Sequence, residues 1–87
     1  MLGFVCVPNG AGEWIVSSIT MPSSAQEQGL KLGDEVVVID GLPLATTPQD
    51  KIAAFWKKPV GTRVTVTTRR KGETKLRQLH IRLQKAL

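Results

Sequence analysis

What constrains the fold of this chain most is the run SSAQEQGLKLGDEVVVIDGLPL, in which turn signals alternate with one short helix and one buried strand. Its first serines precede a helix predicted over Ser24–Gln28, because a serine oxygen caps the unpaired amides of a first helical turn. Gly29 favours the left-handed conformation that ends such a helix. Glu35–Ile39 carries a continuous apolar run, which suits a strand buried on both faces. Asp40-Gly41 then predicts a tight turn into a short strand, Leu42–Leu44.

Two further pairs of strands flank this run. Phe4–Val7 and Glu13–Ile19 are apolar and β-branched segments separated by a Pro-Asn-Gly turn signal, which predicts an N-terminal hairpin. Arg63–Arg70 and Lys75–Gln84 alternate apolar and polar residues with a period of two, which predicts a C-terminal hairpin. The predicted fold is therefore α+β and mainly β: one domain over residues 1–87, with a small barrel or sandwich of five to six strands capped by two helices.

The second of these helices is predicted over Pro48–Lys58. Thr47 stands at the cap position, proline favours the first turn, and Pro59 prevents much continuation. One face of the helix is apolar, because three large side chains fall at i, i+3 and i+4: Ile52, Phe55 and Trp56. We assign the first two to the core and leave the third as a candidate for a more open position.

Charge is distributed unevenly along the chain. Residues 1–50 carry one lysine against six acidic residues, a formal net charge of −5, and residues 51–87 carry eleven Lys/Arg against Glu73, a net charge of +10. One interpretation is a basic surface for nucleic acid or for an acidic partner. We favour solvated strand faces, because the charges alternate with apolar residues and no exposed aromatic run offers bases a stacking platform.

Length and composition exclude several classes of protein. No apolar run approaches the roughly 20 residues of a membrane helix, and no basic segment precedes an apolar stretch as in a signal peptide. Cys6 cannot form an internal disulfide alone, and Cys6 with His80 are too few ligands for a zinc site. Ser17 and Ser18 lack the Gly-x-Ser-x-Gly turn of hydrolases. We therefore expect no catalytic residue, metal or cofactor in these 87 residues.

The chain resembles a PDZ domain over nearly its whole length. Leu2-Gly3-Phe4 resembles the last three positions of the Gly-Leu-Gly-Phe loop, with Met1 in place of its first glycine. A second set of residues is similar to the Ser-Pro-Ala…Ala-Gly-Leu…Gly-Asp…Ile-Asn-Gly signature of bacterial members, namely Ser24-Ala25, Gly29-Leu30, Gly33-Asp34, Ile39 and Gly41. Ser24 replaces the signature proline and Asp40 its asparagine. In the permuted, protease-associated form, the last strand, here Leu79–Leu83, takes the place before the loop.

This resemblance implies a peptide-binding groove between the strand over residues 4–7 and the helix over residues 48–58. Turn amides near the loop would form a small nest for a terminal carboxylate, and the exposed strand edge would pair with an added peptide strand. Strand alternation places Leu2, Phe4 and Cys6 on one face, lining an apolar pocket for the last side chain of the ligand. The implied site residues are Leu2, Gly3, Phe4, Val5, Cys6, Val7, Gln49, Ala53 and Trp56.

The implied function is capture of protein or peptide C-termini with an apolar last residue, without catalysis in this segment. Protease-associated members further imply a longer parent chain, a protease, in the cell envelope or periplasm. Two alternatives stay open. The first is a structural or regulatory domain whose groove is filled by its own parent chain. The second is a domain whose basic C-terminal half binds nucleic acid.

Overall fold

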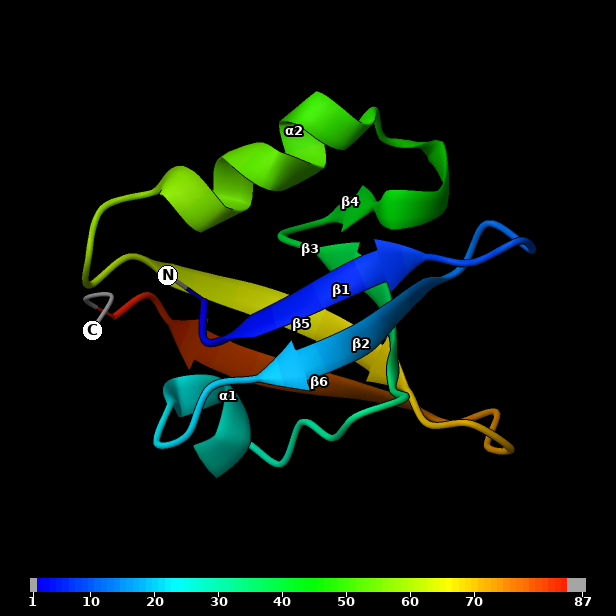
Figure 1. Cartoon of the computed structure of the whole chain (residues 1–87), viewed down its shortest axis with the longest axis horizontal. Helices are drawn as coiled ribbons and strands as arrows, with labels where there is room; N and C mark the ends of the chain where they lie inside the picture. The colour runs from blue at the N-terminus through cyan, green and yellow to red at the C-terminus, as the bar shows by residue number, and fades with distance from the viewer. Residues whose placement is uncertain (1, 85–87) are drawn as a thin grey trace.

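The computed structural model describes residues 2–84, and within them six strands form one antiparallel sheet (Figure 1). The sheet order is β1-β2-β3-β5-β6, with β4 paired to β3 alone. The strands are β1 (Phe4–Pro8), β2 (Trp14–Ile19), β3 (Glu35–Ile39), β4 (Leu42–Pro43), β5 (Arg63–Arg69) and β6 (Leu76–Arg82). The helices are α1 (Ser24–Glu27), the 3-10 turn η1 (Leu44–Thr46), α2 (Gln49–Ala54) and the 3-10 turn η2 (Phe55–Lys57). The predicted mainly-β fold with two helices is confirmed.

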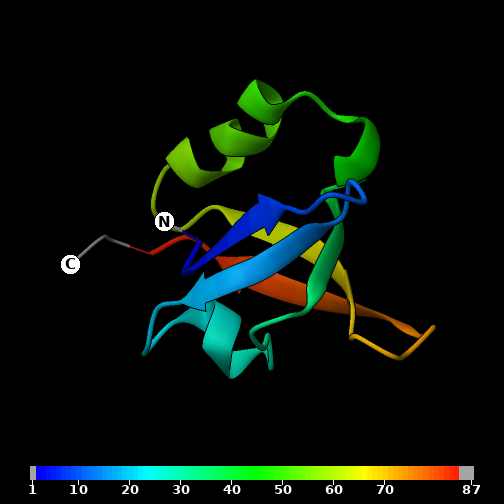
Figure 2. The same ribbon diagram turned by 45° about the vertical axis from the view of Figure 1, so that its right-hand side comes forward.

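The sheet curls so that β1 and β2 lie in front of β5 and β6, with α1 and α2 at opposite ends of the layers (Figure 2). The core fills the space between, because alternate residues of each strand point inward. Those residues include Phe4 and Cys6 of β1, Val16 of β2, Val64 and Val66 of β5, and Leu79 and Ile81 of β6. The period of two in the C-terminal hairpin was thus a correct guide to its buried face.

Helix α1 is capped as its sequence predicts. The Ser23 hydroxyl oxygen accepts a hydrogen bond of 3.1 Å from the backbone N–H of Gln26, and Gly29 follows the helix with φ of 91°. The loop beyond is fastened by Asp34, whose buried carboxylate accepts from the Lys31 backbone N–H at 3.0 Å and from Arg70 Nε at 3.3 Å. Local turn chemistry therefore fixes this end of the molecule.

The predicted threonine cap of α2 is wrong. The Thr47 hydroxyl donates to the carbonyl oxygen of Pro43 at 2.7 Å, and α2 begins after Pro48 with no side-chain cap. Threonine hydroxyls readily bond a carbonyl four residues earlier, and here that bond outcompetes capping. The last turn, Phe55–Lys57, tightens into 3-10 geometry before Pro59 ends the helix.

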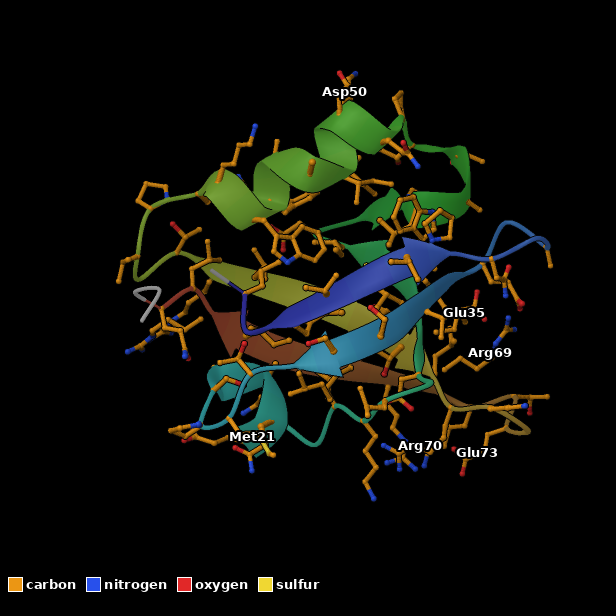
Figure 3. All side chains as sticks on the ribbon, viewed as in Figure 1. Met21, Glu35, Asp50, Arg69, Arg70 and Glu73 are labelled. Carbon is orange, nitrogen blue, oxygen red and sulfur yellow. The ribbon has the colours of Figure 1, made fainter. Side chains whose placement is uncertain are left out.

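Some of the basic residues of the C-terminal half are paired with acids of the first half. Arg69 of β5 donates through Nε to Glu35 Oε1 of β3 at 3.1 Å, and the two side chains lie next to each other in Figure 3. Arg70 also pairs with an acid of the first half, because its Nε lies 3.3 Å from Asp34 Oδ1. The two oppositely charged halves of the sequence are therefore joined where β3 meets β5.

The two edges of the sheet differ in how they are covered. β6 pairs with β5 on one side, and on its other side the Arg82 N–H donates to Ser24 Oγ at 3.1 Å and the His80 N–H to Gln28 Oε1 at 3.4 Å. The helix α1 thus covers the β6 edge with polar side chains, a common protection of exposed strand edges. The segment Leu79–Leu83 was predicted to take the place of a strand before the Leu2-Gly3-Phe4 loop. Its residues up to Arg82 belong to β6, which pairs with β5. The opposite edge of the sheet is β1.

Candidate functional site

An open groove of about 460 Å³ lies between β1 and α2, which run alongside each other in both ribbon views (Figures 1 and 2). Its lining is mostly apolar: Val5, Cys6, Pro8, Trp14, Gln49, Ile52, Ala53, Trp56 and Lys57. Asp50 projects from the opposite side of the helix, away from the sheet (Figure 3). The groove therefore has one strand edge as its floor and one helix face as its wall.

The hydrogen bonds of the N-terminal hairpin show which β1 backbone groups face the groove. At one end the Thr20 N–H donates to the Gly3 carbonyl, and at the other the Asn9 N–H donates to the Glu13 carbonyl, both at 2.8 Å. Because pairing alternates along an antiparallel strand, every second residue between them turns its N–H and C=O outward. Those residues are Phe4, Cys6 and Pro8. An incoming strand thus meets backbone donors and acceptors along this edge, except that Pro8 has no N–H and the Phe4 carbonyl already accepts a side-chain hydrogen bond.

Side chains along β1 alternate in the complementary way. Phe4 and Cys6 point into the core, whereas Val5 and Val7 are 49% and 46% exposed. Leu2, just before the strand, is fully buried. Of the pocket-lining side chains that the resemblance implies, only Cys6 both belongs to the core and reaches the groove.

Trp56 closes the groove at its Phe4 end. Its indole Nε1 donates to the Phe4 carbonyl oxygen at 2.7 Å, and its ring meets the Phe4 ring edge-to-face with centroids 5.3 Å apart. The bond uses the first outward-facing carbonyl of β1. An edge-to-face aromatic pair adds to the contact beyond the area it buries. The helix and the strand are thus tied together here and separate along the rest of the groove.

The turn that precedes β1 requires glycine. Gly3 has φ of +85°, a conformation that side chains rarely adopt, and a Cβ added there would lie 2.8 Å from the Ser23 Cβ. Gly3 is therefore pressed against the residue that caps α1, which holds the start of β1 in place.

The Cys6 thiol is inert in this setting. Burial raises its pKa from 9.0 to about 11, because the thiolate loses hydration that the groove does not replace. A neutral thiol is a poor nucleophile, so the side chain acts as a small apolar surface. The interpretation of Cys6 as a buried hydrophobe is confirmed.

The residues implied by the resemblance divide into two sets. Val5, Cys6, Gln49, Ala53 and Trp56 line the groove together. Leu2 and Phe4 lie in the core, Gly3 forms the turn, and Val7 is exposed and is not among the residues that line the groove. Phe4 is separated from the groove because the Trp56 ring covers it.

Several lining residues were not expected from the sequence. Pro8 and Trp14 are cross-strand partners in the N-terminal hairpin. The hairpin was predicted from the sequence, so its pairing could have placed both residues beside each other. Ile52 of α2 is a core residue that also lines the groove. Lys57 directly follows Trp56 and is the charged side chain among the residues that line the groove. It thus places a cation in the lining of the groove, next to Trp56 in the sequence.

The described part of the chain offers no other obvious chemistry. Within residues 2–84 no group of three or more His, Cys, Asp or Glu side chains is placed to hold a metal ion. In the same range, no helix is both long and apolar enough to cross a membrane. Met1, which stands in place of the first loop glycine, lies outside the described residues.

Comparison with known proteins places this geometry in a family context. Residues 1–81 match the sequence model of the PDZ domain family. The sequence matches none of the curated proteins with which it was compared.

Solved structures show the same fold. A PDZ domain protein from Parabacteroides distasonis superposes with a TM-score of 0.77 at 24% identity, covering 94% of this chain and 19% of that one. The photosystem II D1 C-terminal processing protease superposes with a TM-score of 0.87 at 19% identity, and the match covers 99% of this chain and 23% of that protease. An HtrA-type protease, AlgW, with a decapeptide superposes with a TM-score of 0.76 at 16% identity, and the match covers 97% of this chain and 28% of that protease. The chain thus spans less than a third of each of these proteins.

Proposed function

This chain belongs to the PDZ domain family, and from that premise we propose that it captures the C-terminal tail of another protein by adding the tail as a strand to β1. The observation that carries the proposal is the outward-facing backbone of Phe4, Cys6 and Pro8 beside an apolar groove. A peptide strand placed there pairs with β1 on one side and contacts α2 on the other.

Selective protection of the sheet edges supports this choice of site. The β6 edge is occupied by the Ser24 and Gln28 side chains of α1, whereas β1 is left beside a groove. Native proteins usually block or cover long edges, so an edge left accessible next to an apolar surface favours strand addition.

The lining chemistry supports an apolar last residue on the ligand. The groove floor and wall are formed by Cys6, Ile52, Ala53 and Trp56, which offer a terminal aliphatic or aromatic side chain an apolar contact surface. Lys57 adds a positive charge near the expected position of the terminal carboxylate. Because few residues are buried and the peptide loses conformational freedom, we expect affinity on the order of micromolar.

We further propose that the domain serves a protease as its substrate-recognition or regulatory unit. Two of the similar structures are proteases, one of which holds a decapeptide, although identities of 19% and 16% support only the shared fold. In this proposal the catalytic residues belong to other parts of the parent protein.

The test is calorimetric titration with a short peptide that ends in leucine and with its amidated twin. Amidation is expected to weaken binding at least about tenfold, because it removes the charge that the turn amides and Lys57 would hold. Equal binding of the two peptides would reject carboxylate recognition.

A matched pair of variants tests the location of the site. Ala53 and Ala54 are both exposed on α2, but Ala53 lines the groove and Ala54 faces a separate depression beside Leu42. Ala53→Phe is expected to fill the groove and lower affinity at least about tenfold, with Ala54→Phe unchanged. The same affinity in both variants would place the ligand elsewhere.

A further inference from the structure

We propose that Trp56 determines specificity at this groove: its indole holds the position that a ligand terminus needs, and a tail reaches the Leu2–Phe4 turn only by displacing it. The inference rests on the proposed function and goes beyond it, because the family match does not identify the residue that controls access. It follows from the bond between the indole Nε1 and the Phe4 carbonyl.

The outward-facing carbonyl groups of β1 limit where a peptide strand can pair. The outward-facing carbonyls of β1 belong to alternate residues, spaced about 7 Å apart along the strand. The one nearest the turn, on Phe4, already accepts the indole N–H at 2.7 Å. A peptide strand that pairs with Cys6 and Pro8 therefore leaves the indole in place. A strand that extends to the turn meets Trp56 first.

The end of a ligand tail carries a donor that can replace the indole N–H. The last backbone N–H of a tail is a donor of the same kind, so it can take over the Phe4 carbonyl without leaving that oxygen unpaired. An apolar last side chain can then pack against the displaced ring and the exposed Ala53, which lines the same groove. The β1 edge begins at Phe4, and Gly3 before it is packed against Ser23, so a chain that continues past this residue has no further strand edge to pair with.

Displacing the Trp56 indole from the Phe4 carbonyl lowers the affinity for the ligand. A ligand that needs the displaced conformation binds with an affinity reduced by the fraction of molecules already in it. One net hydrogen bond within a protein corresponds to about a two- to tenfold change in such an equilibrium. Trp56→Phe removes the N–H donor and keeps a smaller aromatic ring at the position beside Phe4, so it tests this contribution with the least change in chemistry.

The experiment compares wild type, Trp56→Phe and Lys58→Gln with the leucine-terminated peptide and its amidated twin. Lys58 lies two residues beyond Trp56, over the Phe55 ring and outside the groove lining, and makes the control. We expect Trp56→Phe to bind the free-acid peptide about two- to tenfold more tightly, and Lys58→Gln to bind as wild type does. NMR of the wild type supplies a readout independent of the variant, since displacement shifts the Trp56 indole N–H resonance.

The outcomes separate this inference from the proposed function. Peptide binding with an unmoved Trp56 indole resonance, or with equal or weaker affinity in Trp56→Phe, overturns the inference and leaves tail capture standing. Failure of wild type and Trp56→Phe alike to bind the free-acid peptide overturns both.

Discussion

The indole nitrogen of Trp56 lies 2.7 Å from the carbonyl oxygen of Phe4, across a separation of 52 residues in the sequence. This bond fixes the spacing between the C-terminal end of α2 and the start of β1, whereas the rest of the two elements encloses an open groove. Trp56 thus sets the spacing of the helix and the strand at the Phe4 end of the groove.

Gly3→Ala is expected to lower the free energy of unfolding by about 2 kcal/mol. The new Cβ meets Ser23 at 2.8 Å and the backbone must keep φ of +85°, which an alanine adopts only at a cost. Urea denaturation measures the change. The control is Gly10→Ala, because a Cβ at Gly10 has nothing within 4 Å and its φ is not in the left-handed range. Equal stability of the two variants would contradict the packing described here.

Alkylation of Cys6 is expected to be slow at pH 8 and to accelerate as pH rises through about 11, since burial raises the pKa of the thiol to about 11. The rate in the urea-unfolded protein should instead rise near pH 8.5, the usual range for a free thiol. The raised pKa also predicts stability that is full below about pH 9 and falls as pH rises through 11. A native rate profile centred near pH 8.5 would show an exposed Cys6.

Lys57→Gln is expected to weaken binding of a free-acid peptide about two- to fivefold and to reduce its dependence on salt, because an exposed charge contributes modestly and is screened. Titrations at two ionic strengths measure both effects. Lys58→Gln is the matched control, since Lys58 lies over the Phe55 ring at 5.4 Å and does not line the groove. Identical salt dependence in the two variants would remove Lys57 from the site.

Ser24→Ala combined with Gln28→Ala is expected to uncover the β6 edge. Without these acceptors, exchange of the His80 and Arg82 amide protons should accelerate about two- to tenfold, and self-association should increase with concentration. Hydrogen exchange and sedimentation velocity measure the two effects. Gln26→Ala, on the same helix but facing Leu30 and Leu32, should change neither. Unchanged exchange in the double variant would mean that α1 does not protect this strand.

The parts of the fold that the sequence predicted best depend on local rules. Alternation in the C-terminal hairpin fixed which face of β5 and β6 is buried, because side-chain direction in a strand follows directly from position. The Ser23 cap was predictable for the same reason, since donor and acceptor are only three residues apart. Strands, turns and the first helix were therefore available from the sequence.

The features that the sequence left open depend on contacts between distant segments. The apolar face of the second helix was visible, but which of its residues would meet Phe4 depends on how α2 lies against β1. Thr47 failed as a cap because the Pro43 carbonyl, held by the turn before the helix, was the better partner. Trp14 entered the groove through its cross-strand position opposite Pro8. Membership of the family does not specify these placements.

Pro8, at the end of β1, gives the groove its other limit. Pro8 offers an added strand its carbonyl oxygen but no N–H donor, so with Trp56 at the opposite end only a handful of ligand residues can pair with β1. A signal that short occurs by chance at the ends of many unrelated proteins. Under the proposed function, so short a recognition length favours chain ends that are unfolded and accessible over the end of any one particular protein.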